Sequence, residues 1–246
     1  MIDKDLLDLL DNLKLDGMKE TLVARIKEAR DHDLDYQEFI KLLLQDEQQV
    51  RSIRSLSAKI KLANFEEIKT LQTLDLKRYT PEVRRVINHL TTGAHLREQK
   101  NVIILGPTGT GKTHLAQALG HDACTKGKKV KFIRSNSLIA EFNASRTDDS
   151  WQTVFNKYVR PDILILDDFG LKPLSQTAAC DLYELIASKH VKSNFIITSN
   201  RKTQGWSELF PDQVMACAAL DRIIHNSYAI VLEGESYRKN FLPKLP

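Results

Sequence analysis

Eight consecutive residues carry the clearest chemistry in this sequence, because their types and spacing fit a phosphate-binding loop. Residues 106–113 match the pattern G-x-x-x-x-G-K-[ST] at every fixed position. A loop that wraps a phosphate turns its backbone N–H groups inward, and a Cβ at Gly106 or Gly111 would obstruct that approach. Lys112 adds a positive charge for the β- and γ-phosphates, and the Thr113 hydroxyl is a ligand for Mg²⁺. The octet therefore predicts a nucleoside triphosphate site.

The segments on both sides of the loop favour this interpretation over a chance match. Residues 102–105 form a short apolar run typical of a buried strand, and apolar residues then recur at helical spacing until Gly127. Strand, loop and helix thus follow in the order that the motif requires. The residues expected to contact the nucleotide are Gly106, Pro107, Thr108, Gly109, Thr110, Gly111, Lys112, Thr113 and His114.

A pair of carboxylates forms the second motif. Residues 163–166 are four branched apolar residues, and Asp167 and Asp168 follow them directly. By themselves two such residues are equally typical of a solvated strand end or a helix cap. Downstream of a complete phosphate loop, they predict that Asp167 holds the Mg²⁺ complex and that Asp168 orients or deprotonates the attacking water.

An amide side chain ends the next predicted strand. Residues 195–198 are followed by Ser199 and Asn200. In an open α/β sheet, ligand-contacting residues lie at the carboxyl ends of the strands. Asn200 is therefore a candidate to reach the γ-phosphate or the water, and a turn-forming asparagine is the alternative.

These motifs require a sheet to position them, and the chain predicts three regions. Residues 1–63 contain many helix formers and no proline, which predicts a small all-helical domain in which Asp35 and Glu38 resemble a capping box. Residues 64–100 are predicted to be a linker that leads into the nucleotide domain and covers the base. Residues 101–246 predict an α/β, three-layer domain with a mainly parallel sheet.

Composition excludes several classes of protein. The chain has 246 residues, of which 42% are hydrophobic and 28% are charged, with a net charge of +4, as in ordinary soluble proteins. Its three cysteines are widely spaced, which favours neither disulfides nor zinc. No apolar run approaches the length of a membrane span, and the N-terminus is acidic. We expect a cytoplasmic protein that is not inserted in a membrane.

Charge is distributed unevenly along the helical region. Residues 1–50 contain 7 basic and 13 acidic groups, whereas residues 51–61 contain four basic groups and no acid. Such a cluster is typical either of a DNA contact or of the solvated face of an amphipathic helix. The first candidate DNA contacts are Arg51, Arg54, Lys59 and Lys61, and the second set, at a predicted strand, is Lys128, Lys129, Lys131 and Arg134.

The order of the motifs resembles a known class of ATPase. The phosphate loop, Asp167-Asp168 and Ser199-Asn200 look like the Walker A, Walker B and sensor 1 elements of AAA+ ATPases. Residues 219–223, which read Ala-Leu-Asp-Arg-Ile, are similar to the arginine-finger segment of the initiator and helicase-loader clade. That resemblance makes Arg222 a candidate finger acting on a neighbouring subunit, and a surface arginine is the alternative.

Nearly the whole chain resembles one family, the IstB family of ATP-binding helpers of insertion-sequence transposition. The resemblance rests on the helical leader, Trp206 after the third strand, residues 219–223 and the Glu-Gly-Glu-Ser-Tyr-Arg segment at 233–238. It implies a homo-oligomer that uses ATP and Mg²⁺, assembles on double-stranded target DNA and stimulates a partner transposase.

Two departures from the general AAA+ pattern have consequences. Asp168 stands where many members have glutamate, and its shorter side chain implies slow hydrolysis, which suits a switch. Only 24 residues follow Arg222, so we expect no full C-terminal lid domain. Arg238 then either substitutes for a lid arginine or contacts DNA.

Two other functions remain open from the residues. A replicative helicase loader shares the same core and differs in its partner. A small-molecule phosphotransferase would have the phosphate loop without needing the basic helix or Arg222. A GTPase is disfavoured because the chain has no N-K-x-D segment.

Overall fold

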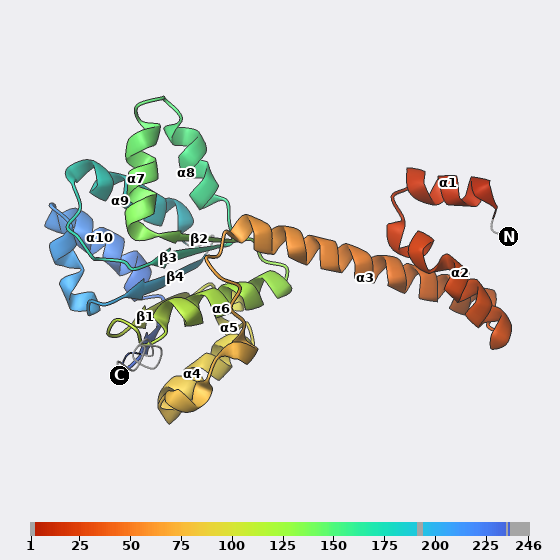
Figure 1. Ribbon diagram of the computed structural model, residues 1–246. Helices are drawn as coiled ribbons and strands as arrows, with labels where there is room; N and C mark the ends of the chain where they lie inside the picture. The colour runs from red at the N-terminus through yellow and green to blue at the C-terminus, as the bar shows by residue number, and fades with distance from the viewer. Residues whose placement is uncertain (1–2, 191–193, 235, 237–246) are drawn as a thin grey trace, which may run out of the picture. The chain divides into compact units, whose positions relative to one another are not determined.

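The computed structural model describes residues 3–190, 194–234 and 236 (Figure 1). The chain divides into two compact units, Met1–Ala58 and Lys59–Pro246. No helix in these described ranges is long and apolar enough to cross a bilayer.

The first unit is helical, as its composition predicts. It contains α1 (Lys4–Asn12), α2 (Asp16–Asp31) and most of α3 (Tyr36–Ala63). The predicted capping box at the start of α3 is confirmed, because the Glu38 N–H donates to Asp35 Oδ1 at 2.8 Å and the Asp35 N–H donates to Glu38 Oε2 at 3.4 Å. The buried core of this unit is small and consists of Leu10, Leu22 and Leu43.

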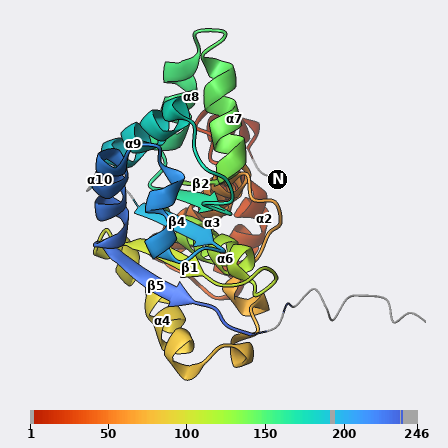
Figure 2. The same cartoon turned by 90° about the vertical axis from the view of Figure 1, so that its left-hand side faces the viewer.

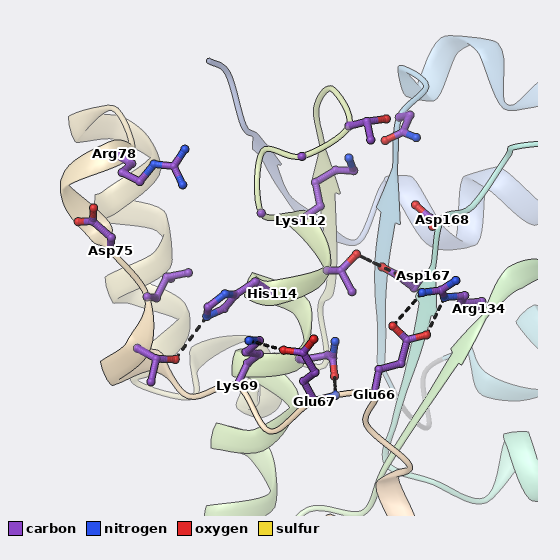
Figure 3. A pocket seen from close by; sticks show the side chains of 18 of the residues that line it. Glu66, Glu67, Lys69, Asp75, Arg78, Lys112, His114, Arg134, Asp167 and Asp168 are labelled. Atoms are coloured by element: carbon purple, nitrogen blue, oxygen red, sulfur yellow. Dashed lines mark hydrogen bonds and ion pairs between the residues drawn. The ribbon is translucent and has the colours of Figure 1, made fainter. Parts of the chain in front are cut away.

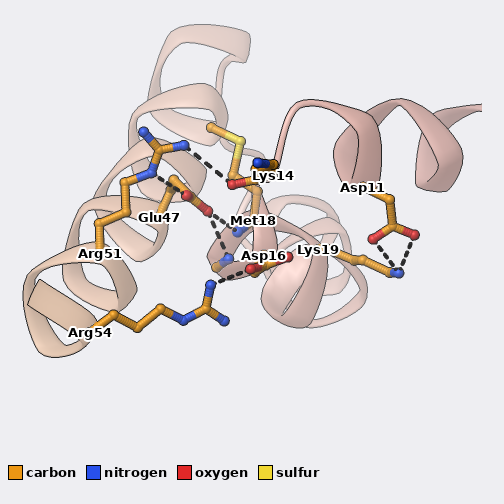
Figure 4. Close-up of polar contacts among 9 residues, drawn as sticks. Asp11, Lys14, Asp16, Met18, Lys19, Glu47, Arg51 and Arg54 are labelled. Carbon is orange, nitrogen blue, oxygen red and sulfur yellow. Dashed lines mark hydrogen bonds and ion pairs between the residues drawn. The ribbon is translucent and has the colours of Figure 1, made fainter. Parts of the chain in front are cut away.

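A buried carboxylate joins α2 to α3 (Figure 4). Glu47 Oε2 accepts hydrogen bonds from the N–H groups of Gly17, at 2.7 Å, and Met18, at 3.3 Å. These N–H groups lie at the start of α2, where no intrahelical partner is available. The two helices approach so closely that a Cβ on Gly17 would lie 2.7 Å from Glu47 Cα. The carboxylate therefore caps α2 and fixes the packing of the pair.

The second unit is built on a five-stranded sheet in the order β2-β3-β4-β1-β5, in which every pairing is parallel. The strands are β1 (Asn101–Leu105), β2 (Val130–Arg134), β3 (Ile163–Asp167), β4 (Asn194–Ser199) and β5 (Ser227–Val231). The helices are α4 (Pro81–Thr91), α5 (Ala94–Arg97), α6 (Lys112–Thr125), α7 (Ser135–Ser145), α8 (Trp151–Val159), α9 (Gln176–Lys189) and α10 (Gln213–Ile224). Short 3-10 turns are η1 (Leu71–Thr73), η2 (Leu76–Arg78), η3 (Thr203–Gly205) and η4 (Ser207–Leu209).

Helices cover both faces of the sheet (Figures 1 and 2). Helices α7 to α10 lie on one face, and α6, α4 and α5 lie on the other. Successive strand residues point to opposite faces, so Leu164 belongs to the core beneath α7 to α10, whereas Ile165 faces α6 at Gly120. Such a sheet is buried on both sides, which explains the continuous apolar runs at 102–105 in β1, 163–166 in β3 and 195–197 in β4. The predicted α/β, three-layer fold with a parallel sheet is confirmed.

Candidate nucleotide-binding site

The phosphate loop connects β1 to α6 at the edge where the parallel strands end. Gly106 has φ 151°, and a Cβ there would lie 2.3 Å from the carbonyl oxygen of Leu232, whose N–H donates to Leu105 at 2.7 Å. Gly111 has φ 94°, and its Cβ would face Tyr79 Oη at 3.1 Å. The sequence predicted that a side chain at these positions would obstruct a phosphate. At Gly106 the obstruction is instead the chain that follows β5.

The side chains of Lys112 and Thr113, which follow Gly111, point into the site. Lys112 is buried, and its Nζ donates to the Pro107 carbonyl at 2.9 Å across the loop. The Thr113 hydroxyl donates to Asp167 Oδ1 at 2.9 Å. Since Lys112 and Thr113 begin α6, the positive end of the helix dipole faces the same space.

Asp167 is fully buried at the end of β3 and is held on two sides. The bond from Thr113 is the dashed line at Asp167 in Figure 3. The Thr198 hydroxyl donates a second bond to Asp167 at 2.6 Å. Burial raises the pKa of Asp167, and the neighbouring charge of Asp168 adds to that increase, while the two hydroxyl donors oppose it. A cation between this carboxylate and bound phosphates would relieve the same cost.

The residues present fit Mg²⁺. Thr113 and Asp167 offer one hydroxyl and one carboxylate, both hard oxygen ligands. Within the described ranges, no group of three or more His, Cys, Asp or Glu side chains could hold a metal by itself. Mg²⁺ is commonly held in this way, by one or two protein oxygens together with substrate phosphates and water.

The backbone of Asp168 has an unusual conformation, which sets the direction of its side chain. Its φ is 53°, in the left-handed region that Asp adopts more readily than most residues, and its N–H donates to the Thr198 hydroxyl at 2.9 Å. Thr198 therefore holds both acidic residues through a single oxygen. No motif in the sequence predicted this role, for which the available signal was a threonine directly after the apolar residues 195–197.

A pocket of about 450 Å³ joins the predicted residues into one site (Figure 3). That volume is typical of small-molecule sites. The predicted residues that line it are Thr108, Gly109, Gly111, Lys112, Thr113, His114, Asp167, Asp168 and Asn200. Asn200 is exposed at the end of β4, as expected for a residue that contacts a ligand.

The opposite wall of the pocket comes from residues 66–79, which precede the sheet. It includes Thr73, Asp75, Arg78 and Tyr79, none of which the motifs identified. Thr73 Oγ1 lies 3.4 Å from His114 Nε2, and burial lowers the pKa of His114. The segment therefore packs against the first turn of α6 beside the phosphate loop.

Arg222 lies at the other edge of the sheet. The side chain of Asn101, the first residue of β1, donates to the Ile223 carbonyl at 3.1 Å, which places the end of α10 where β1 begins. The phosphate loop follows the far end of this five-residue strand, roughly 16 Å away at about 3.3 Å per residue. Arg222 donates to the Ala218 carbonyl at 2.9 Å and lies over the Tyr183 ring. It is therefore out of reach of its own phosphate loop.

Several of the candidate DNA contacts are engaged within their own unit. Arg51 pairs with Glu47 at 2.6 Å, and Arg54 pairs with Asp16 (Figure 4). Lys131 Nζ donates to the Leu62 carbonyl at 3.3 Å. Lys61 and Lys129 are exposed, and Lys59 and Lys128 are partly exposed. Arg238 lies outside the described residues.

Arg134 lies in the predicted strand, but its side chain reaches the nucleotide pocket, which the sequence did not predict. It lines the nucleotide pocket and forms an ion pair with Glu66, with Nε 2.6 Å from Oε1. The sequence placed it in a basic strand, but its position as the last residue of β2 brings it to the same edge as Asp167.

Strand order, phosphate loop and acidic strand end together define a P-loop nucleotide-binding protein of the AAA+ type. Among solved structures, the DnaC helicase loader has a TM-score of 0.53 over 71% of this chain and 99% of that chain, at 19% identity. AMPPCP-bound DnaA from Aquifex aeolicus has a TM-score of 0.57 over 74% of this chain and 58% of that chain, also at 19% identity. At these identities the likeness establishes the fold.

Sequence comparison identifies the family. Residues 8–242 match the family described as IstB-like ATP binding protein, and the chain belongs to it. An insertion-sequence ATP-binding protein of Mycobacterium tuberculosis is 36% identical over 98% of this chain and 96% of its own length. That of the insertion sequence IS21 in Pseudomonas aeruginosa is 34% identical over 94% of this chain and 87% of its own length. The resemblance predicted from the motifs is confirmed, and ATP is the ligand that the family supports.

Proposed function

We propose that this protein is an ATP-controlled DNA-binding regulator of transposition, which oligomerises on double-stranded target DNA and stimulates a partner transposase. One observation supports the nucleotide-dependent part most strongly: Thr113 and Asp167 are joined at 2.9 Å inside a pocket that Lys112 also lines. The relatives named as insertion-sequence ATP-binding proteins support the transposition part.

Five residues of the pocket have a part in the proposed ATP hydrolysis. Lys112 would meet the β- and γ-phosphates, and Thr113 and Asp167 would hold Mg²⁺, which when bound would neutralise charge on the phosphates. Asp168 accepts a proton from the attacking water or orients it, and Asn200 hydrogen-bonds to the γ-phosphate or to the water. The short side chain of Asp168 makes turnover slow.

Arg222 completes the site of a neighbouring copy. Because Arg222 lies far from its own phosphate loop, the ATP site that it can reach is that of a second copy of the chain. An arginine finger stabilises charge on the transferred phosphoryl group only when two subunits meet. ATP would thereby favour assembly, and assembly would favour hydrolysis.

The alternative of a replicative helicase loader rests on the fold shared with DnaC. Both functions predict an ATP-dependent oligomer, so the partner decides between them. Affinity capture on DNA with ATP, in the presence of a candidate partner transposase and of the replicative helicase, should retain the transposase. Retention of the helicase alone would favour the loader.

The ATPase assignment is tested by Asp168→Asn. The amide keeps the size and polarity of the carboxylate but takes no proton from water. We expect this variant to bind ATP with the affinity of the wild type and to release no phosphate, with or without DNA. Phosphate release at the wild-type rate would rule out the role of Asp168. Turnover of small phosphate acceptors in the absence of DNA would favour a phosphotransferase.

A further inference from the structure

Arg134 and Glu66 form an ion pair in the wall of the nucleotide pocket (Figure 3). Arg134 Nε lies 2.6 Å from Glu66 Oε1, and Arg134 Nη2 donates to Glu66 Oε2 at 2.9 Å. This two-pronged arrangement is the most favourable one for a guanidinium and a carboxylate. The functions assigned above to the pocket use neither residue.

The same guanidinium lies beside the acidic residues of the site. In the β2–β3 ladder, Arg134 pairs with Asp167, and Asp168 is the next residue along. Neighbouring strands lie about 4.8 Å apart, a distance that an arginine side chain spans. The pKa of Arg134 is raised first by Glu66 and then, to a smaller degree, by Asp167 and Asp168, so both acids act on this charge.

The three carboxylates differ in how firmly they are already engaged. Asp167 is buried and accepts bonds from two hydroxyl groups. Within the described part of the chain, the carboxylate of Asp168 has no hydrogen-bond or ion-pair partner, whereas Glu66 is bound to Arg134. Asp168 is therefore the acid that would receive Arg134 if Glu66 released it.

The position of Glu66 is fixed by the helix that carries the phosphate loop. The ring of Phe65 lies 3.0 Å from where Gly120 of α6 would carry a Cβ, and the Glu67 N–H donates to Gln117 of α6 at 3.2 Å. Both neighbours of Glu66 in the chain are thus anchored to α6. The backbone of Glu66 is therefore fixed, and its carboxylate lies opposite Arg134.

We propose that Glu66 is a positioning residue that keeps Arg134 away from Asp168, so that the Asp168 carboxylate stays open to the attacking water. This inference rests on the proposed ATPase function. A guanidinium bound to Asp168 would occupy its oxygens and block its contact with water. Glu66 consequently sets the rate of turnover and leaves nucleotide affinity unaffected.

The ion pair between Arg134 and Glu66 is partly open to solvent. The Arg134 side chain is 54% exposed and that of Glu66 is 40% exposed, so water and salt weaken their attraction. Exposed pairs of this kind are broken by one substitution without loss of packing. An isosteric change at Glu66 should therefore leave the fold intact.

Glu66→Gln tests the proposal by removing the charge that holds Arg134. We expect kcat for ATP hydrolysis to fall by about tenfold or more, up to the roughly 10²–10⁴ that a positioned base contributes in full, while KM and the ATP dissociation constant stay constant. Adding Arg134→Gln to this variant should restore much of the lost rate, because no guanidinium remains to bind Asp168. Glu98→Gln is the matched control, because it breaks an exposed ion pair with Lys100 at the opposite edge of the sheet.

The outcomes separate this inference from the function on which it rests. If the wild type turns over ATP and Glu66→Gln turns it over equally fast, the positioning role is wrong and the ATPase assignment stands. If Glu66→Gln is slow and the double variant is no faster, Arg134 does not act through Asp168, and the proposal is overturned. A wild type that hydrolyses no ATP would overturn both.

Discussion

At the scale of single residues, Lys112 is the side chain on which nucleotide binding depends most. Its ammonium group already lies within the loop, bonded to the Pro107 carbonyl. We expect Lys112→Ala to abolish stable ATP binding and to leave the fold intact, since it removes the charge that meets the β- and γ-phosphates. Lys129→Ala, which removes an exposed lysine just before β2 at the other edge of the sheet, is the control. Equal ATP affinity of both variants in a titration would contradict the phosphate-loop assignment.

The proposed role of Arg222 leads to a prediction that involves two copies of the chain. Arg222→Ala should lower hydrolysis by roughly 10³ to 10⁵, as loss of an arginine finger does. If it acts on a neighbour, mixing this variant with Lys112→Ala should restore some phosphate release at junctions where an intact loop meets an intact finger. Mixed oligomers that remain inactive would instead indicate a structural arginine.

At the scale of elements, most of the ATPase core can be read from the sequence because its strands are buried on both faces. Each of β1, β3 and β4 contains a run of three or four apolar residues, and residues of the types that the site needs follow each run at or just after the end of the strand. The strand β5 is different, since Ile230 is the single buried residue among its five described ones. A strand that lies mostly outside the core is not required to show the continuous apolar pattern of a buried strand.

Contacts between segments distant in sequence account for what the motifs did not predict in the site. Thr198 reaches Asp167 from another strand, and Glu66 reaches Arg134 across 68 positions. Neither partner has a fixed spacing from a recognisable motif. The conformation of the phosphate loop, in contrast, depends on eight consecutive residues, so local residue types were sufficient to predict it.

The close approach of α2 and α3 gives a prediction for the helical unit. Gly17→Ala would place a Cβ 2.7 Å from Glu47 Cα and 2.8 Å from the Asp46 carbonyl oxygen, both backbone atoms that cannot move independently. We expect the unit to lose about 1–3 kcal/mol of stability, a typical cost of overpacking. Gly205→Ala meets no atom within 4 Å and is the control. Identical denaturant midpoints for the two variants would show that the helices separate at little cost.

At the scale of the whole molecule, the mild net charge of +4 predicts DNA binding that depends on many weak contacts. No base-reading motif is visible, so binding should be tolerant of sequence and sensitive to salt. Each lysine or arginine that neutralises a phosphate contributes about 0.9 to the slope of log affinity against log salt. Replacing Arg51, Arg54, Lys59 and Lys61 together with Gln should flatten that slope and weaken binding to all sequences alike.

A matched control separates a contact surface from net charge. Replacing Lys4, Lys14, Lys27 and Lys41 with Gln removes the same number of positive charges from residues 1–50. If both variants lose affinity equally, charge alone determines binding. If the first variant keeps the wild-type slope, the contacts lie elsewhere, and Lys128, Lys129 and Lys131 are the next set to replace, without Arg134 because it lines the nucleotide pocket.

The central claim is that ATP joins copies of this chain into an assembly on DNA. Sedimentation of the protein with duplex DNA, in parallel with ATP, ADP or no nucleotide, measures this directly through the mass of the complex. We predict a large complex of several subunits with ATP only, absent with ADP and absent for Lys112→Ala, because linked DNA contacts multiply once the subunits are joined. A complex of the same mass with all three nucleotide conditions would contradict the account.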